Sequence, residues 1–446
     1  MSIVFRRDRV WDGVVVPGII PFNSVYLPEN FLPSQPANFY VIKNTVYIFA
    51  GRFSNAVFLF LLTLVVSRQL GPALFGVYSL LITIVIAANC FSNFGFDIWM
   101  VREVTREPSQ AKNYLSNILG LKIVTSLVTI LFVFLIFQAT DLPPTTLNLL
   151  WILSVSLLFN TLSQSLWHYG NCFKQFIFHS FLWASSNLIK SVLGISLVLL
   201  YRELEPLIWG IVVAEAITLI LSFYVIRYRF GTFVPEFRLS IWKDYLVRSA
   251  PIALGAIFSV LYFRLDIVML QFMTDEKVVG FYSAAYKLFE VSIVLPTSIM
   301  LVLFPTLVEE YHSDLLQFKK SSKKALGVFC LIGGGVALIL WGFSSGIITI
   351  VFGDEFFPSI AVLNILSGAI FLFFLNFLLS NLLISSGRET INTWNLVGAT
   401  VLNIILNLTL IPQYGAIGAA WSTLFCEAVL VLALGIEVRK SVNSNS

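Results

Sequence analysis

Residues 359–385 read SIAVLNILSGAIFLFFLNFLLSNLLIS, a run without a single charged side chain. A helix needs about 20 mostly apolar residues to cross the hydrocarbon core of a membrane, so this run predicts a transmembrane helix. The same character extends to the whole chain of 446 residues, of which 58% are hydrophobic and 12% are charged. Soluble domains carry about 25% charged residues, so the composition excludes a water-soluble globular enzyme. The high hydrophobicity also excludes a disordered chain.

Twelve such stretches follow one another along the chain, and Gly and Pro residues such as Gly71-Pro72 separate several of them. The sequence therefore predicts an all-α integral membrane protein with about twelve transmembrane helices. The predicted spans are 43–66, 74–99, 113–137, 147–167, 176–200, 206–226, 249–272, 280–307, 325–345, 359–385, 391–411 and 414–437.

Lys and Arg residues in short loops orient a membrane protein, because they gather on its cytoplasmic side. With the N-terminus inside, nearly all loop cations fall on the inner side, and only Arg68, Arg202 and Lys277 fall outside. This asymmetry predicts that both termini are cytoplasmic. Orientation and anionic lipid explain these basic loops, so they do not indicate a nucleic-acid partner.

The longest inner loop, 227–248, lies at the midpoint of the chain, and its apolar residues share one helical face. Such a pattern is typical of a short helix that lies in the membrane interface, here as a link between two six-helix bundles. The predicted parts are a cytoplasmic N-terminal tail at 1–42, a bundle at 43–226, the linker at 227–248, a second bundle at 249–437 and a cytoplasmic C-terminal tail at 438–446.

A short internal repeat supports the division into two halves. Residues 76–79 read GVYS at the start of the second predicted span, and residues 280–283 read GFYS at the start of the eighth. Each segment follows the first helix of its half. The match therefore predicts that the two halves have similar structures and are related by an axis along the membrane normal.

Several segments taken together resemble one family, the Wzx-type oligosaccharide flippases of the multidrug/oligosaccharidyl-lipid/polysaccharide (MOP) exporter superfamily. Their order and spacing are more specific than any one of them, and the resemblance covers about residues 43–437. The segments are RQLGPALFGVYS at 68–79, FGFD at 94–97, VRE at 101–103, RLD at 264–266, VGFYSAA at 279–285, FP at 304–305 and LIPQYGAIGAA at 410–420.

The resemblance implies a MATE-like fold of two six-helix bundles in the bacterial inner membrane. It further implies a transporter, not an enzyme, that flips a polyprenyl-pyrophosphate-linked oligosaccharide by alternating access for cell-surface polysaccharide biosynthesis. Its partners would be that lipid-linked oligosaccharide, membrane lipids, and a polysaccharide polymerase with its assembly proteins. Two alternatives stay open: an ion-coupled antiporter of the related multidrug type, and a membrane glycosyltransferase or polymerase. The absence of a large outer loop in the sequence argues against the enzyme.

Five cations fall inside predicted spans, where insertion scales assign a cost of about 2.5–3.5 kcal/mol to each Lys or Arg at a helix centre. A water-filled interior removes most of that cost. We therefore expect these cations to line a cationic cavity and to bind the pyrophosphate, through the bidentate fork of Arg and the point charge of Lys. The candidate substrate-binding residues are Arg52, Lys122, Lys190, Arg264 and Lys287.

Carboxylates also fall in or at the ends of the spans, and they offer the cations an alternative role in ion pairs. Lys287 and Glu290 are spaced i, i+3 and can meet on one helix face, whereas Arg264 and Asp266 are spaced i, i+2 and cannot. Buried carboxylates could instead couple transport to Na+ or H+. The candidate coupling or structural carboxylates are Asp97, Glu215, Asp266, Glu290 and Glu427.

Other polar residues give weaker signals. The chain contains no GxxxxGK[ST] motif for a nucleotide, and His168, His179 and His312 lack metal-ligand spacing, so we expect no metal centre and no cofactor beyond a coupling ion. A set of asparagines gives the tenth and eleventh spans polar stripes, which predict hydrogen bonds between helices or contact with a sugar. They are Asn376, Asn381, Asn392, Asn395, Asn403 and Asn407.

Overall fold

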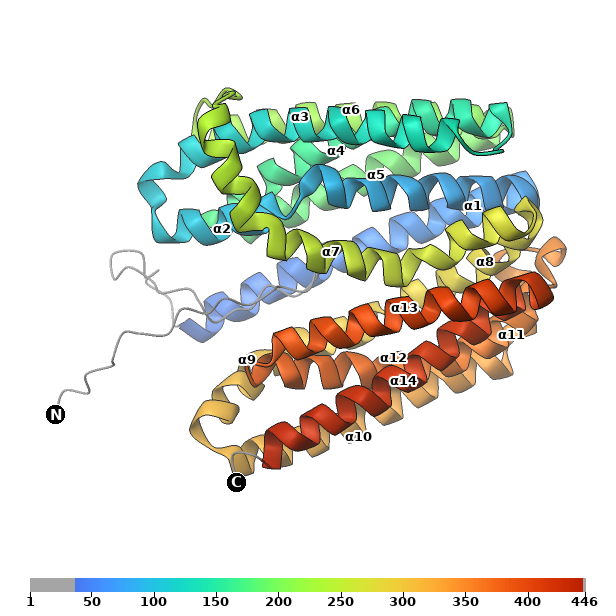
Figure 1. The fold of residues 1–446 in the computed structure, drawn as a ribbon. Coiled ribbons are helices and arrows are strands. Elements are labelled where there is room, and N and C mark those ends of the chain that lie inside the picture. The colour runs from blue at the N-terminus through green and yellow to red at the C-terminus, as the bar shows by residue number, and fades with distance from the viewer. Residues whose placement is uncertain (1–36, 444–446) are drawn as a thin grey trace.

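The computed structural model describes residues 37–443, and it describes side chains at 51 and at 53–441. Within these residues every regular element is a helix (Figure 1). The elements are α1 (Ala37–Asn93), α2 (Phe96–Arg106), η3 (Pro108–Gln110), α3 (Ala111–Gln138), α4 (Pro144–Cys172), α5 (Phe176–Tyr201), α6 (Leu204–Phe230), α7 (Leu239–Met273), α8 (Glu276–Ser292), α9 (Val294–Ser313), α10 (Leu315–Gly342), α11 (Ser344–Val351), η4 (Asp354–Phe356), α12 (Ser359–Ser385), α13 (Glu389–Tyr414) and α14 (Ala416–Asn443).

Eleven helical segments in this part of the chain are long and apolar enough to cross a membrane. The first of them, Phe53–Arg106, has 54 residues. At 1.5 Å per residue it would be about 80 Å long, more than twice the hydrocarbon thickness. The backbone leaves helical geometry at Gly71 (φ 72°, ψ 178°), and Pro72 follows. The chain reverses there (Figure 1), so this segment holds two crossings and the predicted twelve spans are confirmed.

The helices pack into two halves, one from α1 to α6 and one from α7 to α14. In the first half α1 packs on α3, α4 and α5, and α4 packs on α6; in the second, α12 and α13 pack on α14, and α10 packs on α12. The halves splay apart toward the end where α1 begins and α14 ends, and they converge at the opposite end, where α1 and α8 meet (Figure 1). We call the opposite end the Gly71 end.

The segment between the halves is more helical than the linker predicted at 227–248. Helix α6 continues to Phe230, and α7 already begins at Leu239. The side chains of Trp242 and Tyr245 are buried, and the Tyr245 ring lies 4.5 Å from that of Trp99 on α2. The first turns of α7 therefore anchor on the first half before the helix crosses to the second.

The predicted tails lie only partly within the described residues. Residues 1–36 lie outside them, and residues 37–42 already belong to α1. At the other end α14 continues to Asn443, so most of the tail predicted at 438–446 is helical. Both helices thus extend beyond the apolar cores from which the span limits were predicted.

Candidate functional site

A cavity of about 850 Å³ lies between the two halves. Its walls come from α1, α4, α5 and α6 on one side and from α7, α8, α9, α12, α13 and α14 on the other. This volume falls within the range of ligand pockets, about 300–1,000 Å³. The lining extends from Phe75, near the Gly71 end, to Asn392 and Leu434, nearer the end where α1 begins and α14 ends. The hollow expected from the in-membrane charges is therefore present.

Charged side chains of both signs line this cavity. Among the described residues, three are cationic and three are acidic, so the formal charges balance and the lining is not the uniformly cationic surface that we expected. These residues are Lys190, Glu215, Arg264, Lys287, Glu290 and Glu427.

The charges are distributed unevenly over the wall. On α7 and α8, Arg264 and Lys287 share one carboxylate, Glu290, at N–O distances of 2.6 Å and 2.9 Å. Two cations on one acid leave this triad with a formal charge of +1. The side chains of Arg264 and Lys287 are 24% and 23% exposed, so both remain open to the cavity. The i, i+3 pair predicted between Lys287 and Glu290 is confirmed.

The first half contributes a balanced pair across the cavity. Lys190 on α5 lies 3.0 Å from Oε1 of Glu215 on α6, and the amide of Asn160 donates to the same oxygen at 3.1 Å. Both residues of the pair line the cavity. Lys190 therefore lines the hollow and also forms the ion pair that the sequence left open, and its role in binding a substrate stays a prediction.

Lys122 requires a correction. Its side chain is fully buried, its Nζ lies 2.7 Å from Oδ1 of Asp97, and it also donates to the carbonyl of Thr161 at 3.1 Å. The hydroxyl of Ser165 donates to the same Asp97 oxygen at 2.6 Å. Lys122 does not belong to the described cavity lining, so the cavity role expected for it is wrong.

The reason for this correction lies in the backbone between α1 and α2. Phe94 and Gly95 adopt positive φ angles of 46° and 73°, and the chain turns there directly into the short helix α2. The turn brings Asp97 beneath α3, where it meets Lys122. A partner 25 residues away cannot be found by a search for acids within one helical turn.

Arg52 lies in α1, one turn before the cavity-lining residue Asn55. Its side chain lies outside the described residues. The substrate-binding role predicted for Arg52 therefore stays a prediction.

Two carboxylates of the second half are enclosed by neutral donors. Asp266 on α7 accepts hydrogen bonds from the Tyr282 hydroxyl at 2.6 Å, the Asn407 amide at 2.6 Å and the Thr423 hydroxyl at 2.9 Å. These donors come from α8, α13 and α14, so the carboxylate ties four helices together. Asp266 is buried and does not belong to the described cavity lining.

Glu427 on α14 lines the cavity but is almost fully buried. It accepts from the Tyr262 hydroxyl at 2.8 Å and from the side-chain amide of Asn376. For Asn376 and Asn407, the predicted hydrogen bonds between helices are confirmed. The sequence did not point to Tyr262 or Thr423, because an isolated hydroxyl in an apolar run carries no spacing signal, and it marked Tyr282 only as part of the GFYS repeat.

Comparison with known proteins shows to which family the chain belongs. A family described as polysaccharide biosynthesis protein matches residues 41–310, more than half of the chain. The chain belongs to this polysaccharide biosynthesis protein family. It is also 22% identical over 411 residues to the capsular polysaccharide biosynthesis protein CapF of Staphylococcus aureus, which covers 88% of this chain and 98% of CapF.

Solved structures show that this family member has the fold expected from the resemblance. It superposes on the lipid II flippase MurJ in an inward closed conformation with a TM-score of 0.73, at 16% identity and 89% coverage of each chain. It superposes on the inward-facing conformation of a multidrug resistance MATE family transporter of the MOP superfamily with a TM-score of 0.68, at 14% identity and 88% and 96% coverage. The chain thus combines a polysaccharide biosynthesis family with the fold of MOP-superfamily transporters, and together they support a MOP-type transporter.

Proposed function

We propose that this transporter flips a polyprenyl-pyrophosphate-linked oligosaccharide from the inner to the outer leaflet of the bacterial inner membrane. The observation that carries the proposal is the triad of Arg264, Lys287 and Glu290 on the cavity wall. Its two cations lie within reach of a single carboxylate and remain partly exposed to the cavity. A pyrophosphate could replace Glu290 as their partner and bring more negative charge than the carboxylate does.

The remaining lining suits the rest of such a substrate. Asparagine and serine side chains from α1, α4 and α12 also face the cavity, among them Asn55, Asn160 and Ser380. These groups offer hydrogen bonds in place of the water that a sugar would lose. In this proposal the lipid tail stays in the bilayer through a lateral gap while the two halves rock. Both termini are cytoplasmic, and a polysaccharide polymerase with its assembly proteins receives the product.

In this proposal H+ or Na+ moves down its gradient through the protein and drives this movement. The supporting observation is that Glu427 and Asp266 are buried carboxylates, and both are hydrogen-bonded only by neutral side chains among their described partners. Neutralising such a group by H+ or Na+ would remove the cost of a buried negative charge. Transport driven in vesicles by a pH gradient alone, or by a Na+ gradient alone, separates the two ions.

The test of the substrate removes single charges from the triad. Arg264→Gln and Lys287→Gln are each expressed in a strain that lacks the gene, and surface polysaccharide is measured against protein level in the membrane. The matched control is Lys277→Gln, because Lys277 is an exposed residue on the same helix as Lys287 and does not belong to the cavity lining. We expect both triad variants to lose most surface polysaccharide and the control to keep it. Normal polysaccharide from both well-expressed triad variants would refute the proposed site.

A multidrug-type antiporter remains the second candidate, because the carboxylates Glu215 and Glu427 also line the cavity and would attract a cationic compound. Drug susceptibility of the deletion strain distinguishes it. An unchanged susceptibility together with lost surface polysaccharide supports the flippase, and the reverse result supports the antiporter.

A further inference from the structure

Two glycines meet where α1 and α8 cross at the Gly71 end. A Cβ atom placed on Gly76 would lie 1.9 Å from the carbonyl oxygen of Glu276, and one placed on Gly280 would lie 2.0 Å from the carbonyl oxygen of Pro72. Any larger side chain at either position would collide with backbone. The two helices therefore touch backbone to backbone, as small residues allow at helix crossings.

The contact is reciprocal. Gly76 packs on the carbonyl group of Glu276, four residues before Gly280, and Gly280 packs on the carbonyl group of Pro72, four residues before Gly76. A two-fold relation between contacting surfaces produces this pattern, in which residue i meets residue j and j meets i. The two glycines also occupy the first position of the GVYS and GFYS repeats. Equivalent segments of the two halves thus meet each other at this crossing.

A second contact between the halves lies close by. Arg68 on α1 donates from Nε to the carbonyl of Val351 at 3.0 Å and from Nη2 to the carbonyl of Ile350. Both carbonyls belong to the last turn of α11, whose final carbonyls have no partner inside the helix. The guanidinium of the first half therefore caps a helix of the second half, where its positive charge is also favoured by the helix dipole.

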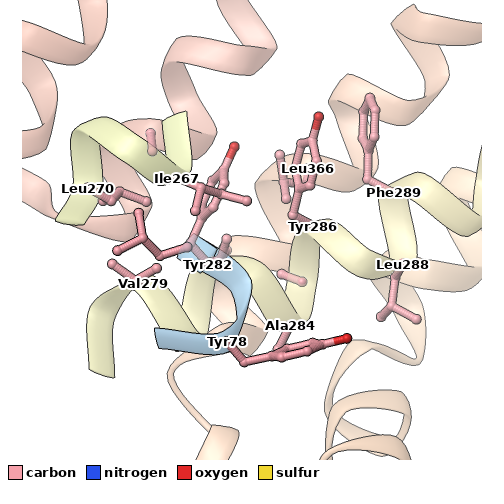
Figure 2. Close-up of a cluster of buried hydrophobic side chains, with 14 of the residues drawn as sticks. Tyr78, Ile267, Leu270, Val279, Tyr282, Ala284, Tyr286, Leu288, Phe289 and Leu366 are labelled. Carbon is pink, nitrogen blue, oxygen red and sulfur yellow. The ribbon is translucent and has the colours of Figure 1, made fainter. Parts of the chain in front are cut away.

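An aromatic contact completes this set. The ring of Phe75 lies 5.8 Å from that of Phe356 and 6.3 Å from that of Phe352, and all three side chains are buried. One turn further along α1, Tyr78 joins a buried cluster with Ile267 of α7 and residues of α8 (Figure 2). Phe75 and Tyr78 also belong to the cavity lining, so these contacts close the cavity at the Gly71 end.

We propose that the Gly76–Gly280 crossing, capped by Arg68 and backed by Phe75, is the gate at the Gly71 end of the cavity. In this structure the gate is closed, and cargo leaves by this end only when the crossing separates. At the crossing itself two bare backbones meet without interlocking side chains, so opening requires the Arg68 cap and the Phe75 ring contacts beside it to separate as the halves rock. This inference rests on the proposed alternating access but not on the identity of the substrate.

The experiment measures access to the cavity from the Gly71 end. Ser79 lies one turn beyond Gly76 and lines the cavity, so Ser79→Cys is the reporter. A membrane-impermeant maleimide is added to intact cells, and labelling is compared with the parent chain to subtract its four natural cysteines. Gly76→Ala is expected to raise the labelling rate about tenfold, because the added methyl prevents closure. The matched control is Gly335→Ala, since a Cβ atom there meets nothing within 4 Å.

A second variant keeps the test decisive if Gly76→Ala does not reach the membrane. Arg68→Gln removes the cap on α11 without adding bulk, and it should raise labelling in the same direction by a smaller factor. If the Gly71 end faces the cytoplasm instead, the reagent reaches it in inverted vesicles. The same assay on such vesicles then shows the increase in labelling. Unchanged labelling from both faces in a well-inserted variant would overturn the gate. The readout is independent of transport, so a failure of the proposed substrate leaves it interpretable.

Discussion

The buried pair Lys122–Asp97 allows a sharp test of which membrane cations are structural. Replacing Lys122 with Met keeps the length of the side chain and removes its charge, which leaves Asp97 buried at 2% exposure without its cation. Breaking a buried ion pair by removing one partner costs about 3–5 kcal/mol. Proteins have a total stability of about 5–15 kcal/mol, so this loss is a large fraction of it.

The assay is the melting temperature of the purified protein in detergent, with expression level measured in parallel. We expect Lys122→Met to melt well below the parent. Adding Asp97→Asn should recover much of the loss, because the lone charge disappears while Ser165 keeps a partner. Lys112→Met is the matched control, since Lys112 is an exposed residue in the first turn of the same helix.

The opposite result is equally informative. If Lys122→Met melts like the parent but no longer transports, the ammonium group acts on the substrate and not on the fold. The assignment of Lys122 to a structural pair would then be refuted, and so would the argument from burial that separates it from Lys190.

Two further variants test the backbone turn and the polar cluster. Tyr282→Phe removes the hydroxyl that donates to Asp266 at 2.6 Å, and hydrogen bonds to charged groups contribute about 1.5–3 kcal/mol. It should lower thermal stability more than Tyr286→Phe, whose hydroxyl donates to the neutral carbonyl of Phe263; equal losses would contradict a charged Asp266. Gly95→Ala places a Cβ at φ 73° and 2.9 Å from Ile252, so it should destabilise by about 1–3 kcal/mol. Gly327→Ala meets nothing within 4 Å and serves as its control in the same melting assay, where equal behaviour of the two would show that the α1–α2 turn tolerates a side chain.

The spans could be predicted from the sequence because the bilayer imposes a length and a composition on each helix. Local pairing was equally accessible. Lys287 and Glu290 meet because an α-helix places residues three apart on one face, and Arg264 and Asp266 do not meet for the same reason. In the structure Arg264 pairs with Glu290, whereas Asp266 accepts hydrogen bonds from α8, α13 and α14.

Pairs between helices could not be predicted, because they depend on how the helices pack. Lys122 and Asp97 are brought together by the positive φ angles of Phe94 and Gly95 and by the packing of α2 below α3, and neither leaves a pattern in charge spacing. The sum of charges on the cavity wall was inaccessible for the same reason. It required knowing which side of each helix faces the hollow, and helices as uniformly apolar as these give little indication of that.

The buried pair of Lys122 and the triad of Arg264, Lys287 and Glu290 differ in a way that matters for the proposed recognition of an anion. Lys122 is fully enclosed with its carboxylate, so using it to bind a substrate would require breaking a buried pair first. Arg264 and Lys287 are already partly hydrated and share one acid, so an anion can join them by exchange with Glu290 and need not remove a full shell of water. Since desolvation is the main cost of binding a charge in the membrane interior, the proposed function places the anionic headgroup at the triad, where the described cavity makes that cost lowest.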